Sequence, residues 1–373
     1  ENKPAIPIIY TLNIDGTSIK INSELIYTST DPVKGEVVKP CMIVPELMGE
    51  IENPIYILTN NEARTINVKL KTNGKAKSGI CMLAVPRGWR VEPINHTFSL
   101  SQKEEKLLSF KIFPPPSNFT GYLRAAAVSD GVTYSQNVDL IEYDHIPTQL
   151  VLDDAQAKLI KTDLVIKGNK IAYIMGAGDE VPECLELIGY DVTNLTESEI
   201  NLENLKQYDA VLTGIRAFNT NKYLEYKTKV LHEYVNGGGT VLVQYNTNHR
   251  LVTKDIAPYP IKLSRDRVTE ENASVQLINK EHVALNSPNK ITTQDFQYWI
   301  QERGLYFPNE WDENFVPLIA SNDTNEKSKT GSILVAEYGD GHFVYTGISW
   351  FRQLPAGVPG AYRLIANLIS LGN

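Results

Sequence analysis

The pattern that most constrains this chain is a strand–helix–strand unit in its C-terminal part. Val211–Asn219 and Thr240–Asn248 each begin as a short apolar run rich in Val and Leu and then stop abruptly at polar residues. Between them, Lys222–Val235 has apolar residues at helical spacing, and three glycines follow it closely. Apolar strands that alternate with helices are typical of a parallel sheet buried on both faces. This unit therefore predicts a doubly wound α/β domain.

The same alternation extends through residues 168–373, which we expect to form that domain. Its other predicted strands are Lys170–Met175, Tyr190–Leu195, and an antiparallel pair formed by Ser332–Glu337 and His342–Thr346. Its other predicted helices are Val181–Ile188, which has Pro182 in its first turn, and Gly360–Leu371. Residues 249–331 lack the alternation and are predicted to be a long insertion.

The N-terminal part has a different pattern. From residue 21 to residue 147, short runs of Val, Ile, Leu and Tyr alternate with turns such as Asn73-Gly74 and Asp130-Gly131, without a helical stretch. This spacing predicts a β-sandwich. Residues 1–20 are expected to form a leading strand or hairpin, and residues 148–167 a linker. A chain of 373 residues is long enough for two such domains.

Composition excludes several classes of function. The net charge is −8 and no cluster of Lys and Arg stands out, which argues against a nucleic-acid partner. No apolar run approaches the length of a membrane span. The sequence opens at Glu1 rather than Met, as in a processed protein or a piece of a longer one. Cys41, Cys81 and Cys184 form no recognisable framework and are expected to be buried thiols; no metal-ligand spacing is present, so no metal site is predicted.

A glycine-rich turn, Gly176-Ala177-Gly178, follows the first strand of the α/β domain. A dinucleotide-binding fingerprint needs a third glycine at fixed spacing and an acidic residue after the second strand. Neither is present. Pro182 stands close to where the third glycine would be needed, and the second strand ends in Asn194-Leu195, without an acidic residue. We therefore expect a tight turn that places Asp179 near a helix N-terminus, and no cofactor.

Ligands of open α/β sheets bind at the carboxyl ends of the strands. Polar residues from those ends and from the insertion therefore make up the candidate site. The candidates for ligand binding are Arg216, Asn219, Tyr245, Asn246, Arg265, Arg267, Arg303, Trp350 and Arg352. The candidate acids or bases are Asp179, Asp266 and Glu302. Several arginines beside aromatic rings would suit an anionic molecule or a sugar.

Longer motifs suggest a family. They are Tyr143–Pro147, Tyr173–Asp179, Gly214–Thr220, Gln244–Asn248, Ser264–Thr269, Gln301–Phe307 and Arg352–Arg363. Together they resemble the C-terminal half of bacterial LmbE/PIG-L-type deacetylases, notably from Bacteroidetes. The resemblance covers nearly the whole chain. It implies an immunoglobulin-like sandwich, which Ala84–Pro93 also resembles, followed by a class I glutamine amidotransferase-like (ThuA-like) domain of flavodoxin type.

The resemblance stops short of the catalytic motifs. The deacetylases carry an Ala-His-Pro-Asp-Asp type of zinc motif in a preceding domain, and this chain has none. Amidotransferases place a nucleophilic Cys on a sharp elbow after a strand, where Tyr245 is expected to stand here. Cys184 lies in a predicted helix and cannot replace it. Without a thiolate and its base, release of ammonia from glutamine is not expected.

Three functions remain open at this stage. The first is a non-catalytic accessory region of a secreted carbohydrate-processing protein, which binds a sugar or an anionic small molecule. The second is a hydrolase of a carbohydrate derivative that uses the Asp, Glu and Arg candidates. The third is a structural assembly module. The resemblance also implies a periplasmic or extracellular location, and a deacetylase domain N-terminal to this region as partner in the same polypeptide.

Overall fold

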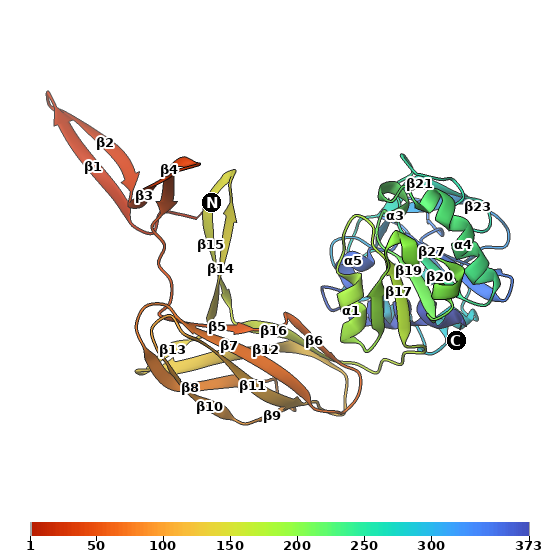
Figure 1. The fold of residues 1–373 in the computed structure, drawn as a ribbon, viewed down its shortest axis with the longest axis horizontal. Coiled ribbons are helices and arrows are strands. Elements are labelled where there is room, and N and C mark those ends of the chain that lie inside the picture. Colours follow the sequence, from red (N-terminus) through yellow and green to blue (C-terminus); the bar gives the residue numbers. More distant parts are fainter. Residues whose placement is uncertain (1, 373) are drawn as a thin grey trace. The chain divides into compact units, whose positions relative to one another are not determined.

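The computed structural model describes residues 2–372 and divides into two compact units (Figure 1). The first unit includes the residues up to 54, 61–116 and 120–159; the second includes 55–60, 117–119 and the residues from 160 onward. Most of the regular structure is β-sheet, arranged in several sheets, and the helices are concentrated in the second unit. Among the described residues, none of the helices has the length and apolar character needed to cross a membrane.

Two antiparallel sheets form the larger part of the first unit. One has the order β5-β7-β11-β9, with strands β5 (Leu47–Ile51), β7 (Arg64–Thr72), β9 (Arg90–Glu92) and β11 (Glu105–Phe113). The other contains β10 (Asn95–Leu100), β8 (Lys77–Ala84) and β12 (Phe119–Ser129) in that order, and β13 (Val132–Tyr134) pairs with β12. Every second side chain of β7 and β11 is buried, including Val68 and Phe110. Such alternation buries one face of a sheet and leaves the other in water.

Three two-stranded hairpins complete the first unit. They are β1 (Pro7–Ile14) with β2 (Thr17–Glu24), β3 (Ile26–Asp31) with β4 (Gly35–Pro40), and β14 (Gln136–Tyr143) with β15 (Ile146–Asp154). Asp15 and Gly16, both in the left-handed backbone region, make the turn between β1 and β2. The stretch expected to be a linker, 148–167, holds most of β15 and all of β16 (Gln156–Lys161).

A seven-stranded sheet is the centre of the second unit, and its order is β18-β17-β19-β20-β27-β26-β24. The strands are β17 (Lys170–Ile174), β18 (Asp191–Asn194), β19 (Ala210–Thr213), β20 (Thr240–Gln244), β24 (Val316–Pro317), β26 (Ile333–Tyr338) and β27 (Gly341–Thr346). The five strands from β18 to β27 are parallel, whereas β26 and β24 are antiparallel additions. The strand β6 (Ile55–Leu58) is also grouped with this unit.

Helices cover both faces of this sheet. Successive side chains of a strand point to opposite faces, so neighbouring residues contact different helices. Leu212 and Leu242 pack with helices α1 (Val181–Leu187) and α6 (Pro359–Ile369). Their neighbours Val211 and Val241 pack on the other side with α2 (Leu202–Leu205), α3 (Ala217–Thr220) and α4 (Leu224–Asn236). The predicted alternation of strands and helices is therefore present in three layers. Of the cysteines, Cys81 and Cys184 are buried as expected, and Cys41 is only half-buried.

The segment between β20 and β26 corresponds to the predicted insertion 249–331. It contains two small antiparallel pairs, β21 (Ile261–Val268) with β23 (Gly304–Trp311) and β22 (Val275–Leu277) with β25 (Ile319–Ser321). It also contains the 3₁₀ turns η2 (Val283–Leu285) and η3 (Thr293–Phe296). The insertion thus has its own hydrogen-bonded structure and lies against the α/β sheet.

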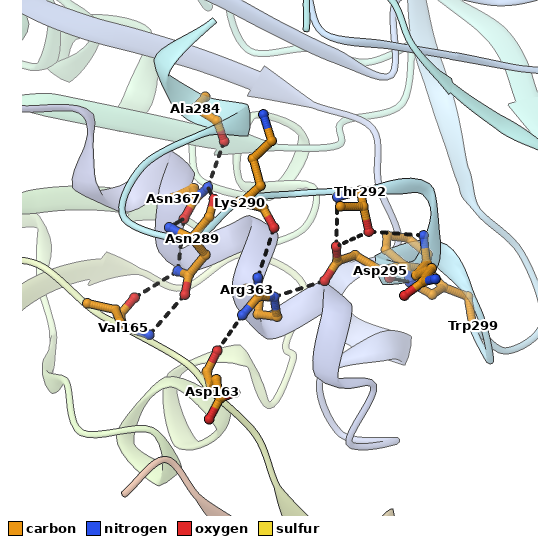
Figure 2. A network of polar contacts seen from close by, with 11 residues as sticks. Asp163, Val165, Ala284, Asn289, Lys290, Thr292, Asp295, Trp299, Arg363 and Asn367 are labelled. Carbon is orange, nitrogen blue, oxygen red and sulfur yellow. Dashed lines mark hydrogen bonds and ion pairs between the residues drawn. The ribbon is translucent and has the colours of Figure 1, made fainter. Parts of the chain in front are cut away.

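A polar network attaches this insertion to α6 (Figure 2). Arg363 on α6 donates from Nε to Asp295 Oδ1 at 2.9 Å and from Nη2 to the Lys290 carbonyl at 2.8 Å. Asn367, one turn further on, holds Asn289 through both its amide oxygen and its amide nitrogen. Because these side chains are largely or fully buried, their hydrogen bonds fix the loop 289–295 on the helix.

Candidate functional site

The carboxyl ends of β17, β19 and β20 are tied to one another by side-chain hydrogen bonds. Asp179, a candidate acid or base, accepts from the Tyr173 hydroxyl at 2.6 Å and from the backbone N–H groups of Val181 and Ile215 at 3.1 and 3.0 Å. The amide of Gln244, at the end of β20, donates to the same Tyr173 hydroxyl at 2.8 Å. The Asp179 carboxylate is thereby occupied in bracing two loops, which suits a structural role.

The two candidate asparagines have the same kind of role. Asn246 is fully buried; its amide oxygen accepts from the Phe218 N–H at 2.9 Å and its amide nitrogen donates to the Gln244 carbonyl. Asn219 accepts from the Thr247 N–H at 2.9 Å and donates to two carbonyls of the same loop. Both amides are used in joining the loops after β19 and β20, so they position the site rather than offer groups to a ligand.

Three of the predicted residues, Arg216, Glu302 and Arg352, do come together around the phenol of a fourth, Tyr245. Its ring is only 7 % exposed, and burial raises its pKa. The charges of Arg216 and Arg352 act to lower that pKa, and the charge of Glu302 acts to raise it, so all three groups lie within electrostatic reach of the hydroxyl. Arg216 follows β19, Tyr245 follows β20, Arg352 lies in α5 (Trp350–Gln353) after β27, and Glu302 belongs to the insertion.

The three charged groups of this cluster differ in their partners. Arg352 Nε donates to Glu302 Oε1 at 2.8 Å, and its Nη1 donates to the side chain of Gln301. The exposed guanidinium of Arg216 makes neither an ion pair nor a hydrogen bond with any part of the chain that the structure describes. Arg216 is therefore the cationic group of the cluster that remains available to a ligand.

Aromatic rings surround the same phenol. Tyr306 stacks on Tyr245 with 6.1 Å between ring centroids and 9° between planes, and Phe351 lies at 5.6 Å in a tilted arrangement. The guanidinium carbon of Arg352 stands 4.9 Å from the Phe351 centroid. Sequence reasoning missed Tyr306 and Phe351 as members, although Tyr306 lies in the motif Gln301–Phe307 and Phe351 stands between the candidates Trp350 and Arg352.

The sharp strand-to-helix turn lies at Arg216 and not at Tyr245, where the sequence analysis placed it. Arg216 has φ 56° and precedes α3 directly, whereas Tyr245 is absent from the left-handed residues and no helix follows β20. A bulky residue in the left-handed region carries backbone strain of about 1–3 kcal/mol, and residues strained in this way cluster at functional sites. The Arg216 N–H donates to the Tyr245 carbonyl at 2.8 Å, which ties the two positions together.

The remaining candidates lie apart from this cluster. Trp350 is fully buried, with its indole N–H directed to the Thr346 hydroxyl at 3.2 Å, so it is a core residue. Arg265 and Arg267 point into solvent from β21. Asp266 lines a separate hollow with Trp311 and Lys329. The insertion thus places Arg265, Asp266 and Arg267 on its own surfaces instead of at the strand ends.

Arg303 also points away from Tyr245, into the insertion. It is 6 % exposed, and its guanidinium donates to the Ala273 carbonyl from Nε and Nη2 and to the Phe296 carbonyl from Nη1 at 2.6 Å. Burial lowers its pKa to about 10. Within residues 2–372, no group of three or more His, Cys, Asp and Glu side chains is arranged to hold a metal ion.

The second unit is thus an open α/β domain with a charged and aromatic cluster at the carboxyl ends of its strands. No protein-family model and no curated protein matches the sequence. Among solved structures, the chain resembles a ThuA-like protein from Bacteroides uniformis, at 12% identity and TM-score 0.36 over 53% of this chain and 89% of that one.

Two other solved structures resemble the chain to a similar or smaller extent. A cold-adapted β-galactosidase from Rahnella sp. R3 matches at 13% identity and TM-score 0.35, over 55% of this chain and 32% of that one. A family 123 glycoside hydrolase from Clostridium perfringens matches at 8% identity and TM-score 0.20, over 55% and 39%. All three TM-scores are below 0.5, and these likenesses carry no functional argument.

Proposed function

We propose that this chain is a non-catalytic, ligand-binding region of a secreted carbohydrate-processing protein of the LmbE/PIG-L type. The α/β domain would be a degenerate amidotransferase-like (ThuA-like) domain that binds an acidic sugar at its strand ends, preceded by an immunoglobulin-like sandwich. A deacetylase domain would precede both in the same polypeptide, in the periplasm or outside the cell. The observation that carries the proposal is the cluster around Tyr245.

The chemistry of that cluster suits an acidic sugar better than a reaction. The exposed Arg216 guanidinium can donate charge-assisted hydrogen bonds to a carboxylate or sulfate. Glu302 and the remaining N–H groups of Arg352 can accept from and donate to sugar hydroxyls, and the rings of Tyr306 and Phe351 offer apolar surface to the sugar. Both ring positions are only partly buried, so a ligand can reach them.

The carboxylates are poorly placed for acid–base catalysis. Asp179 is occupied by three hydrogen bonds, Glu302 is paired with Arg352, and Asp266 lies in a different hollow. Glycoside hydrolysis requires two carboxyl groups facing each other across the bond to be broken. The nominated set supplies one carboxylate at the cluster, which favours binding over hydrolysis.

A glycan array carrying neutral and acidic sugars tests the proposal. The wild-type chain is expected to bind acidic sugars, and Arg216→Ala to lose that signal by about tenfold or more, since loss of one charge-assisted hydrogen bond costs roughly 1.5–3 kcal/mol. Arg250→Ala is the matched control, because Arg250 is also exposed and left-handed but does not act on the Tyr245 phenol. Equal binding by wild type and Arg216→Ala would remove this site. Absence of binding together with self-association would instead indicate an assembly module.

A further inference from the structure

A second feature of the α/β unit points to a ligand, and it lies in the insertion. Arg303 forms part of the floor of an open hollow of about 530 Å³, together with Phe296 and the strand β22. Polar side chains that are exposed to solvent make the rim. They are Asn272, Ser274, Thr293 and Gln297. A volume of this size is in the range of small-molecule sites.

Arg303 is a buried cation without a carboxylate in ion-pair contact among the described residues. The carboxylate that acts on it from a distance is Glu271, whose Oε1 already accepts the Gln301 N–H at 2.5 Å. A buried charge is costly unless it is paired. Its three hydrogen bonds to carbonyls use three of the five guanidinium N–H groups, so two donors of this lining residue remain without a partner among the described residues.

Tyr298 stands at the edge of the same hollow, and its conformation is unusual. Its side chain is 85% exposed, and its backbone has φ 61°, in the left-handed region. An aromatic residue in this region is strained. Because the Tyr298 ring is exposed, packing within the chain does not offset that strain. An exposed ring beside hydrogen-bonding groups is the usual arrangement for stacking against the flat face of a sugar or another ring.

The loop that carries these groups is held rigidly. Thr292 and Asp295 form a reciprocal cap at the start of η3, and the Trp299 indole N–H donates to the Asp295 carbonyl at 2.8 Å. Asp295 is itself fixed by Arg363 of α6, as Figure 2 shows. The Trp299 ring lies 5.5 Å from the guanidinium carbon of Arg303. Contacts within the chain therefore support the hollow on both sides of Tyr298.

We infer that this hollow is a binding site for a carboxylate-bearing sugar, with the carboxylate on Arg303, the ring against Tyr298 and the hydroxyls on the polar rim. The site is separate from the cluster around Tyr245, because Arg303 and Glu302, although adjacent in sequence, have different partners. The planar guanidinium can hold a carboxylate through two parallel hydrogen bonds. The inference goes beyond the proposed function and does not require it.

Calorimetric titration of the whole chain with D-glucuronate tests the inference, with D-glucose and acetate as probes that lack the carboxylate or the ring. Tyr298→Gly removes the ring and also relieves the left-handed strain, so it is expected to keep or raise the melting temperature and to weaken glucuronate binding at least tenfold. Asn325→Gly is the matched control, because Asn325 in the same insertion is also left-handed, with φ 64°. It is expected to bind as the wild type does.

Arg303→Lys, which keeps the charge and loses the planar fork, is expected to abolish the preference for glucuronate over glucose. The same titrations in an Arg216→Ala background separate this site from the strand-end cluster, since the Tyr298-dependent binding is expected to persist there. Three results would overturn the inference. They are absence of binding of glucuronate by the wild type, equal binding by wild type and Tyr298→Gly, and binding of acetate as tight as that of glucuronate.

Discussion

The carboxylate of Asp179 accepts the hydroxyl hydrogen of Tyr173 at 2.6 Å, and this contact joins strand β17 to the loop that follows it. Tyr173 is fully buried, and burial, followed by the charge of Asp179, raises its pKa well above the usual value, so the hydroxyl stays protonated as the donor. The second carboxylate oxygen holds the Ile215 N–H beside Arg216. Asp179 therefore controls the backbone from which Arg216 projects.

Replacing Asp179 by Ala is expected to destabilise the second unit by roughly 3 kcal/mol or more, because three donors, Tyr173, Val181 and Ile215, would each lose a partner at about 1–3 kcal/mol. Asp179→Asn keeps one acceptor oxygen and is expected to cost less. Urea unfolding followed through the second unit's tryptophans measures both variants. Equal stability of wild type and Asp179→Ala would contradict the bracing role and restore Asp179 as a candidate acid or base.

Gly176, two residues after the end of β17, makes possible a close contact between the loops that follow β17 and β19. A Cβ on Gly176 would lie 2.1 Å from the Ile215 carbonyl oxygen, and the Ala177 N–H donates to that same oxygen. Gly176→Ala must therefore displace backbone, at about 1–3 kcal/mol or more. Gly178→Ala is the comparison: a Cβ there meets nothing within 4 Å, and only its positive φ is unfavourable. Thermal unfolding is expected to show the larger loss for Gly176→Ala, and the opposite order would refute the close-contact explanation.

Periodicity was enough to predict most of the second unit, because its strands are buried on both faces and its helices alternate with them. The strand predicted at Lys170–Met175 ends one residue earlier, at Ile174, and the helix predicted at Lys222–Val235 begins two residues later, at Leu224. The site was predicted less well. The structure brings Arg216 and Tyr245 side by side, since topology alone places the ends of β19 and β20 together.

The insertion could not be predicted in the same way. Its path depends on irregular backbone, including left-handed Tyr298, Gln301 and Tyr306, for which neither helical nor strand periodicity gives a signal. As a result the adjacent Glu302 and Arg303 were assigned to one pocket although they have different partners. Arg363 was not singled out as functional or structural, because its partners are mostly backbone carbonyls of distant residues, which composition does not reveal.

The ion pair of Arg363 and Asp295 is expected to matter more than surface pairs do. Their side chains are 20% and 12% exposed, and Arg363 also holds the carbonyls of Asp163 and Lys290. Arg363→Ala leaves a largely buried carboxylate with fewer donors, so a loss of roughly 2–4 kcal/mol is expected. Lys262→Ala is the control, since its pair with Glu310 is about two-thirds exposed and worth about 0–1 kcal/mol. Urea unfolding measures both variants. Similar small losses in both would show that the polar network drawn in Figure 2 does not stabilise the second unit through Arg363.

Three histidines of the second unit make its stability depend on pH. Burial lowers the pKa of His232, His282 and His342, and His282 Nδ1 also accepts the Ala284 N–H, which requires that nitrogen to be unprotonated. An unfolded histidine binds a proton near pH 6.5, whereas these bind one at lower pH when folded. The unfolded state therefore holds more protons below about pH 6.5, and stability falls as pH drops from there through the lowered values. The melting temperature is expected to be lower at about pH 5.5 than at about pH 7.5. Both pH values lie above the range in which most carboxylates titrate, so the difference reports the histidines. His232→Gln should make the dependence shallower, and an unchanged slope would exclude that histidine as a contributor.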